Sequence, residues 1–420
     1  LTFTQSDFSI DVALTAEGDA PAAATDGETD AALTANGGDA AADVPADTEA
    51  PAETEAPVAT EAPTQAPAEA TPVPEATPAP TPLPLLTAVA DDSAAPSAIK
   101  LDAKAYEDLK LKDGYAREKK IVMLEPYQYA IWEQSGVLTF RGDPFRQNAA
   151  YGTVDIRSKT FSEIWRVPME GSIKAKSATL TGLGWPGQPL IVKWPTQLRA
   201  ILGLNDAAKA KQALKEVMVG GQNGKLYFLD LVTGEATREA LTFDWPSSGA
   251  LSLQTNATPM LAVGQHIGVL AKKTVENQLR LYNLMNNKEI ASLKGKDKLM
   301  RSNYSGFNGA PLFDKNTGAM VFGGENGVLY TMEPHDEFDH VLATLKVTPA
   351  WQRYTWLADK QKAKSTNIDG SVAMYGSYVY FGDQSGIVQC VDVNTLTPVW
   401  AVNTGDNVDA TIALDMENAD

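Results

Sequence analysis

The stretch Gly-Gly-Gln-Asn-Gly-Lys-Leu-Tyr-Phe-Leu-Asp, at residues 220–230, decides the fold of this chain. It returns as Gly-Gly-Glu-Asn-Gly-Val-Leu-Tyr-Thr-Met-Glu at residues 323–333 and as Gly-Asp-Gln-Ser-Gly-Ile-Val-Gln-Cys-Val-Asp at residues 382–392. Each of these copies places an Asn-Gly or Ser-Gly turn between runs of apolar, β-branched and aromatic residues. That arrangement is a strong signal for a β-hairpin.

The spacing of the copies indicates how the hairpins are organised. A weaker copy begins at Glu276, and the four copies align at Gly224, Asn277, Gly327 and Gly386, which lie 53, 50 and 59 residues apart. Periods of about 50 residues are typical of propellers and solenoids. A hairpin in every such unit predicts an all-β fold, a β-propeller of four-stranded blades.

A second repeated phrase places small residues just before an apolar strand. It occurs at residues 187–192, 256–261, 308–313, 370–375 and 409–414. Small residues suit inner strands, whose backbones approach closely around a propeller axis. We therefore expect blades at residues 187–243, 256–293, 308–347 and 370–404, with a helix–turn–helix insertion at residues 197–215 in the first of them.

Two tryptophans share a third phrase. Trp165 and Trp400 are central in residues 163–167 and 398–402, so we expect both in outer strands, buried between blades. Residues 163–167 have no inner strands before them, and residues 408–414, an expected inner strand, have nothing after them. This pattern predicts a C-terminally truncated propeller, incomplete in this fragment, with about four full blades plus terminal strands.

Residues 1–99 differ sharply from the rest of the chain. They contain no Lys or Arg, 18 of the 53 acidic residues and 13 of the 25 prolines. Such a segment cannot bury enough apolar surface to fold, and it predicts a disordered acidic Pro/Ala/Thr-rich stalk. We assign residues 100–136 to a lead-in segment and residues 137–420 to the propeller.

The charge balance beyond residue 99 bears on the partners. That part holds 35 basic and 35 acidic residues, so it gives no reason to expect nucleic acid as a partner. The chain begins at Leu1 and contains no run of 18 apolar residues, so we expect any membrane contact to come from an upstream anchor. A stalk behind such an anchor predicts an extracytoplasmic protein at the cell surface.

The run Asn-Gly-Lys-Leu-Tyr-Phe-Leu-Asp-Leu-Val-Thr-Gly, at residues 223–234, resembles the PQQ-like (quinoprotein-like) β-propeller repeat. Two further phrases, Thr-Phe-Arg-Gly at 139–142 and Gly-Trp-Pro-Gly-Gln-Pro at 184–189, resemble PQQ-like repeat proteins of anaerobic Gram-positive bacteria. The resemblance covers roughly residues 135–415 and implies the propeller fold on the surface of such a bacterium. It leaves the function open, because the superfamily includes quinoprotein dehydrogenases, outer-membrane assembly scaffolds and many surface proteins.

The resemblance implies one enzymatic alternative, a quinone (PQQ)-dependent or other small-molecule-binding enzyme. Quinoprotein dehydrogenases hold the quinone against a disulfide between adjacent cysteines and bind calcium through a Glu/Asn/Asp set. Cys390 is the only cysteine, so that disulfide cannot form, and no matching calcium set is found. We therefore expect no cofactor, no metal and no catalytic residue.

Other candidate sites have simpler interpretations. The stretch His-Asp-Glu-Phe-Asp-His at residues 335–340 could bind a metal, but we expect a solvated loop there. Residues 415–420 alternate oxygen ligands in the manner of a calcium loop, yet they lack its central glycine, which favours a turn. Trp185 and Trp194 flank the first inner strand, and Arg141 lies in a Gly-Asp-Pro turn beside it. All three could contact a ligand at the channel mouth or pack around it. The leading hypothesis is a non-catalytic, surface-displayed propeller that binds a protein or cell-wall glycan partner.

Overall fold

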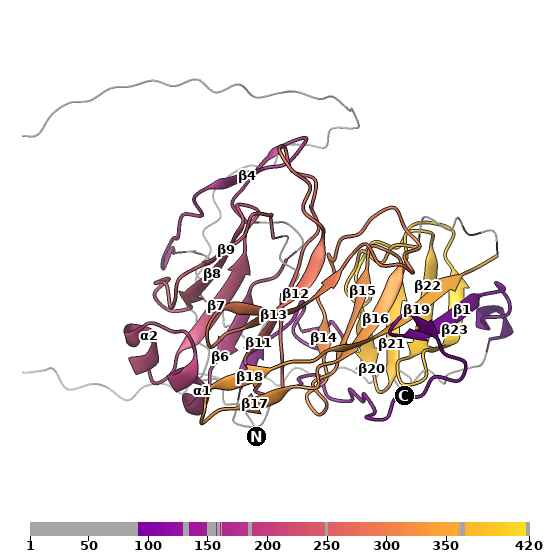
Figure 1. Ribbon diagram of the computed structural model, residues 1–420, viewed down its shortest axis with the longest axis horizontal. Helices are drawn as coiled ribbons and strands as arrows, with labels where there is room; N and C mark the ends of the chain where they lie inside the picture. Colours follow the sequence, from indigo (N-terminus) through magenta and orange to yellow (C-terminus); the bar gives the residue numbers. More distant parts are fainter. Residues whose placement is uncertain are drawn as a thin grey trace, which may run out of the picture. The chain divides into compact units, whose positions relative to one another are not determined.

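A computed structural model gives the architecture of the chain (Figure 1). It describes residues 91–128, 134–148, 157, 160, 162–183, 187–247, 251–359, 361 and 366–416. Strands dominate these residues, and the α-helices among them are two short ones, α1 (Thr196–Ile201) and α2 (Asp206–Ala210). Both helices lie in the insertion that was predicted between residues 197 and 215. None of the described helices is long and apolar enough to span a membrane.

The strands form four antiparallel sheets arranged as the blades of a β-propeller. Blade one consists of β6 (Leu190–Lys193), β7 (Lys215–Gly220), β8 (Lys225–Asp230) and β9 (Leu241–Thr242). Blade two consists of β10 (Leu251–Leu253), β11 (Met260–Gly264), β12 (Gln278–Asn283) and β13 (Lys288–Lys294). Blade three consists of β14 (Leu312–Phe313), β15 (Met320–Gly324), β16 (Val328–Glu333) and β19 (Ala350–Leu357). Blade four consists of β20 (Ala373–Tyr375), β21 (Tyr378–Gly382), β22 (Ile387–Asp392) and β23 (Thr397–Asn403).

The repeated turns join the second and third strands of blades one, three and four. Gly224, Gly327 and Gly386 have φ angles of 77°, 76° and 90°, a conformation that glycine adopts without strain. A Cβ atom at Gly224 would lie 2.8 Å from the carbonyl oxygen of Phe243. The glycine of the repeat therefore serves both the turn geometry and the close approach of a neighbouring segment.

The apolar cores lie between successive blades. One cluster joins blades one and two, with Phe228 and Leu261 among its buried members. A second joins blades two and three, and a third joins blades three and four around Trp356 and Phe381. Each blade therefore shares its core with the next one along the chain.

Several outer segments differ from the sequence-based expectation. Residues 163–167 and 408–414 are not strands, although both were expected to be. Trp165 instead lies over the turn at Gly234 and donates a 3.0 Å hydrogen bond to the carbonyl oxygen of Leu231. Trp400 is in the outer strand β23 as expected, but it is half-buried rather than fully buried. Part of the indole therefore stays in contact with solvent.

Blade three is extended at its outer edge by the lead-in segment. β1 (Asp102–Glu107) pairs antiparallel with β19 over six residues, and β2 (Lys110–Leu111) pairs with β1. Blade three therefore ends at β19 and not at residue 347, and its sheet has six strands. The lead-in is an integral part of the fold.

The same segment then crosses to blade four, and we call residues 91–128 the strap. Arg117 inserts into blade three, where its guanidinium bonds to Glu333 at 2.6 Å and to Gln352 at 3.0 Å. Ile121 bonds through its backbone to Asn394 of blade four. The next strand, β3 (Ser135–Val137), pairs with β6 as a fifth strand on the inner side of blade one.

Blade three also carries an insertion, residues 334–349, which we call the arm. It contains the hairpin of β17 (Glu337–Asp339) and β18 (Thr344–Lys346). The arm is the segment that was expected to be a solvated loop with two histidines. It is instead an ordered hairpin with a defined register. A second hairpin, β4 (Ser172–Lys174) and β5 (Thr179–Thr181), precedes blade one.

Candidate functional site

Residues 138–148 form the segment at which the inner strands of all four blades meet. The carbonyl oxygen of Leu138 accepts a hydrogen bond from the backbone N–H of Leu253 in blade two, at 2.8 Å. Thr139 donates to the carbonyl oxygen of Pro311, which leads into blade three, and Pro144 accepts from Met374 in blade four, both at 2.8 Å. We call this segment the plug, because it occupies the inner ends of the blades.

Arg146 is the central side chain of the plug. Its Nε donates to the carbonyl oxygen of Val372 in blade four, and one terminal nitrogen donates to that of Ala310 before blade three, both at 2.8 Å. The other terminal nitrogen bonds to Thr139 at 2.9 Å and to the carbonyl oxygen of Phe140 at 2.5 Å. One fully buried guanidinium thus donates to backbone carbonyl groups that lie outside the paired strands.

The charge of Arg146 is only partly offset within the plug. Burial lowers the pKa of Arg146 to about 9, whereas the nearby Asp143 carboxylate acts in the opposite direction. Burial also raises the pKa of Asp143, and hydrogen bonds from Asn148 and the backbone oppose that shift. Gly142 makes the tight loop possible, because its φ is 79° and a Cβ atom there would lie 1.9 Å from the carbonyl oxygen of Asn148.

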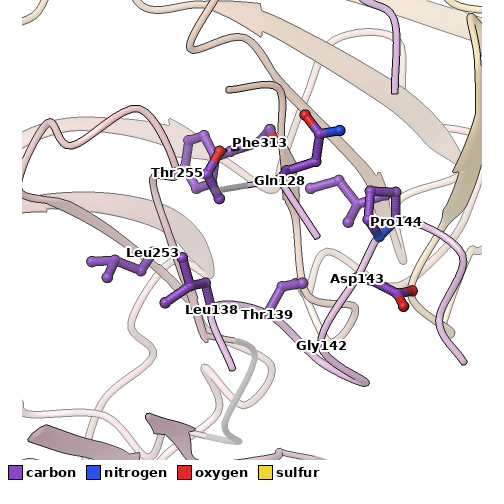
Figure 2. A pocket seen from close by; sticks show the side chains of 10 residues that line it. Gln128, Leu138, Thr139, Gly142, Asp143, Pro144, Leu253, Thr255 and Phe313 are labelled. Atoms are coloured by element: carbon purple, nitrogen blue, oxygen red, sulfur yellow. Dashed lines mark hydrogen bonds between the residues drawn. The ribbon is translucent and has the colours of Figure 1, made fainter. Parts of the chain in front are cut away.

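A small cavity lies beside the plug (Figure 2). Its volume is about 20 Å³, which is room for about one water molecule. Figure 2 shows it between the plug and the inner strands of blades two and three. It is lined by Gln128, Leu138, Thr139, Gly142, Asp143, Pro144, Leu253, Thr255, Leu312 and Phe313. The threonine hydroxyls and the Gln128 amide could hold a water there, but a fused-ring cofactor would not fit this space.

A second polar cluster joins blades two, three and four. Nδ1 of His266, in the loop after β11, lies 2.5 Å from Oε1 of Glu325, in the turn between β15 and β16. The hydrogen bond to Glu325 raises the pKa of His266, while burial raises the pKa of Glu325 more than His266 lowers it. Asp369, before β20, adds negative charge to both groups and bonds to Asn308 at 3.1 Å.

This cluster brings an imidazole and two carboxylates together at the ends of the blades. It does not provide a metal site, because in the described part of the chain no three His, Cys, Asp or Glu side chains are placed to share an ion. The two histidines of the arm, His335 and His340, do not belong to a group of three such side chains among the described residues either. His335 faces Glu333 at 3.6 Å, and Asp336 accepts a 2.9 Å hydrogen bond from Thr258. The motif at residues 335–340 is therefore spread along the arm.

The three predicted channel-mouth residues have different positions. Arg141 is in the plug, where its backbone N–H donates to Gln188 at 2.9 Å and its φ is 56°. Trp194 is buried in the core of blades one and two, and its indole N–H donates to Glu216 at 2.7 Å. That position makes Trp194 a packing residue of blade one. Trp185 lies outside the described residues, as do residues 417–420 of the expected C-terminal turn.

The phrase at residues 139–142 was recognised from the sequence, but Arg146, four residues further on, which makes the main contacts of the plug, was not singled out. One signal was present, since an arginine follows a Gly-Asp-Pro-Phe turn directly after an apolar strand. His266 and Glu325 gave no such signal, because they come from different blades 59 residues apart.

Comparisons with known proteins identify no family for this chain. No protein-family model matches the chain, and no curated protein matches it. Among solved structures, it is similar to BamB from Moraxella catarrhalis at 15% identity and a TM-score of 0.35, covering 57% of this chain and 65% of that chain. It is also similar to the computationally designed Ika4 protein at 14% identity and a TM-score of 0.26, covering 42% of this chain and 85% of that chain. The chain thus spans just under two thirds of the BamB chain, and its own strand pairing establishes the blades.

Proposed function

We propose that this chain is a non-catalytic binding or scaffolding propeller of the PQQ-like type, which contacts a protein partner through its outward-facing loops. The observation that carries the proposal is the plug. Arg146 and its neighbours occupy the inner ends of the blades with bonds to the blades themselves, and the adjoining cavity has room for about one water molecule. The surfaces left for recognition are therefore the loops and hairpins at the rims of the blades.

The composition of residues 1–99 supports an extracytoplasmic setting. An acidic, proline-rich segment without Lys or Arg suits a spacer that carries the propeller away from a membrane and, in a Gram-positive bacterium, through the cell wall. A cell-wall glycan is the alternative partner. Mild protease treatment of intact cells should release the propeller if this placement is right, and a fragment found only after lysis would contradict it.

A titration with quinone and calcium tests the non-catalytic proposal. The whole chain would be mixed with PQQ and Ca²⁺ while absorbance and dye-linked alcohol oxidation are recorded. We expect neither stoichiometric binding nor turnover, because the plug fills the inner ends of the blades. Stoichiometric quinone binding with dye reduction would overturn the proposal and favour the quinone-dependent enzyme.

A further inference from the structure

The tip of the arm exposes two neighbouring aliphatic side chains on a rigid support. Val341 is 78% exposed and Leu342 is 71% exposed, the highest values among the large apolar residues that the structure describes. The Asp339 carboxylate accepts hydrogen bonds from the backbone N–H groups of both, at 2.8 and 2.9 Å. The tip is therefore an ordered turn that holds two adjacent apolar side chains in water.

The rest of the arm is fixed against the propeller. The backbone N–H of Thr348 donates to Pro334 at 3.0 Å across the base of the arm. Asp336 bonds to Thr258 of blade two, and Phe338 packs against the core shared by blades one and two. The arm therefore starts in blade three and is bound toward blade two, away from blade four.

A complementary apolar surface lies on blade four. In the strap, Ile121 and Met123 are fully buried, so the alternate residues Lys120, Val122 and Leu124 face outward. Met123 pairs with Gly376 by an isolated bridge, which places Leu124 beside the β20–β21 hairpin, where Tyr375 and Tyr378 are cross-strand partners. We call Lys120, Val122, Leu124, Tyr375 and Tyr378 the blade-four patch.

The patch and the tip match in polarity and in charge. The four apolar members of the patch are between 38% and 58% exposed, and Lys119 and Lys120 at its border are exposed. The tip carries Asp339 beside its aliphatic pair, whereas the carboxylate of Glu337 on the same hairpin is already paired with Lys346 at 3.0 Å. The tip, an aliphatic pair with an adjacent carboxylate, is thus complementary to the patch, an apolar surface bordered by lysines.

We propose that the arm tip of one molecule docks on the blade-four patch of a second copy of this chain. Within one chain the two surfaces cannot meet, because the arm is bound toward blade two and blade three separates it from blade four. The contact is heterologous, so each molecule keeps a free tip or a free patch and can add another copy. This association would occur whether or not the propeller also binds another protein.

The small size of the contact predicts weak association. Two aliphatic side chains against a patch of four apolar residues bury less than the roughly 1,200 Å² of a standard stable interface. We therefore expect rapid exchange and assembly that grows with concentration, as on a crowded surface. Raising the salt concentration, or the substitution Lys120→Glu, should weaken it by about two- to five-fold, the effect of an exposed charge pair.

Sedimentation velocity on the whole chain tests the proposal. The tip variant is Val341→Ser with Leu342→Ser, the patch variant is Leu124→Ser with Val122→Ser, and the matched control is Val232→Ser, an exposed aliphatic residue of blade one. We expect the wild type and the control to form dimers and longer species with rising concentration, and each of the other two variants to stay monomeric. Equal thermal melting curves would show that all variants fold.

Mixing the two inactive variants identifies the geometry. The tip variant retains a patch and the patch variant retains a tip, so an equimolar mixture should form dimers and stop there. A wild type that is monomeric at every concentration would overturn the proposal. So would a tip variant that associates like the wild type, or a mixture that stays monomeric while the wild type assembles.

Discussion

Arg146 is the residue whose removal should reveal what the plug contributes to stability. Replacing it with Met keeps the volume but leaves the carbonyl groups of Val372, Ala310 and Phe140 without their donor. Each buried acceptor left unsatisfied costs about 1–3 kcal/mol, so Arg146→Met should lower the free energy of unfolding by at least about 3 kcal/mol. Urea denaturation would measure this, with Arg166→Met, an exposed arginine, as the control. A loss under about 1 kcal/mol would show that the plug is not needed to hold the blades.

Two tryptophans of outer strands should differ in how much they contribute to the free energy of unfolding. Trp356 is fully buried in β19 and its indole N–H donates to Asp383 at 2.7 Å, whereas Trp400 in β23 is half-buried and lies 6.0 Å from the ring of Tyr380. Trp356→Ala should cost about 3–5 kcal/mol, and Trp400→Ala about half of that. Equal losses in calorimetry would mean that Trp400 is covered in solution.

Residues that act within their own repeat could be read from the sequence, and residues that act across blades could not. The turn glycines Gly224, Gly327 and Gly386 follow from the local Asn-Gly or Ser-Gly pattern, and all have positive φ. Trp194 was placed near the channel because it flanks an inner strand, but the direction of its side chain depends on Glu216 in β7. Strand alternation decides such directions, and a one-residue difference reverses them.

At the scale of elements, the His266–Glu325 pair links the loop after β11 to the β15–β16 turn and should make that contact depend on pH. The pKa of His266 is raised above its ordinary 6.5, so its stabilising effect is complete below pH 6.5 and is lost as the pH rises through the folded-state pKa. Burial raises the pKa of Glu325 above its ordinary 4.5, so stability is also lost as the pH rises from 4.5 through the folded-state pKa of Glu325. The groups facing the pair are the carboxylate of Asp369 and the Asn277 side chain, which donates to the carbonyl oxygen of His266.

Chemical denaturation between pH 6 and pH 8 measures this dependence. The wild type should lose stability as the pH rises, and His266→Gln and Glu325→Gln should each flatten the curve. His335→Gln, in the exposed part of the arm, is the control and should behave like the wild type. A wild-type curve that rises with pH, or a Glu325→Gln curve that keeps the wild-type slope, would contradict the prediction.

Elements with a repeated pattern were predicted better than elements that pair across long distances. The hairpins and the helical insertion follow from local turn chemistry and composition. β1 pairs with β19 about 250 residues further along the chain, and nothing in the sequence of residues 102–107 indicates which strand it will pair with. Residues 163–167 have the composition of an outer strand, but in the structure Trp165 bonds to the turn after β8 and no strand forms there.

For the whole molecule, the strap sets where limited proteolysis should stop. If the acidic segment before residue 91 lacks fixed structure, as its composition predicts, a protease should remove it and leave a core that begins between about residues 91 and 101. Cutting further would remove β1 and free the Arg117 contacts, so a stable core should not begin between residues 113 and 136. Mass spectrometry of the resistant fragment would identify its first residue. A stable fragment that starts after β1 would show that the strap is dispensable.

The strap also determines which part of the protein would carry a mechanical force applied to the chain. If the segment upstream of residue 91 serves as a tether, tension enters the propeller through the start of the strap, where Ile99 and Leu101 pack against Ile387 and Ala401 of blade four and the backbone of Ile99 bonds to Asp359 at 2.9 Å. Behind these contacts the load would meet the six-residue pairing of β1 with β19 and then the buried Arg117, whose guanidinium is bonded to Glu333 and Gln352. Blade three would thus act as the mechanical anchor, and the blades and loops beyond it would stay unstrained until that clamp yields.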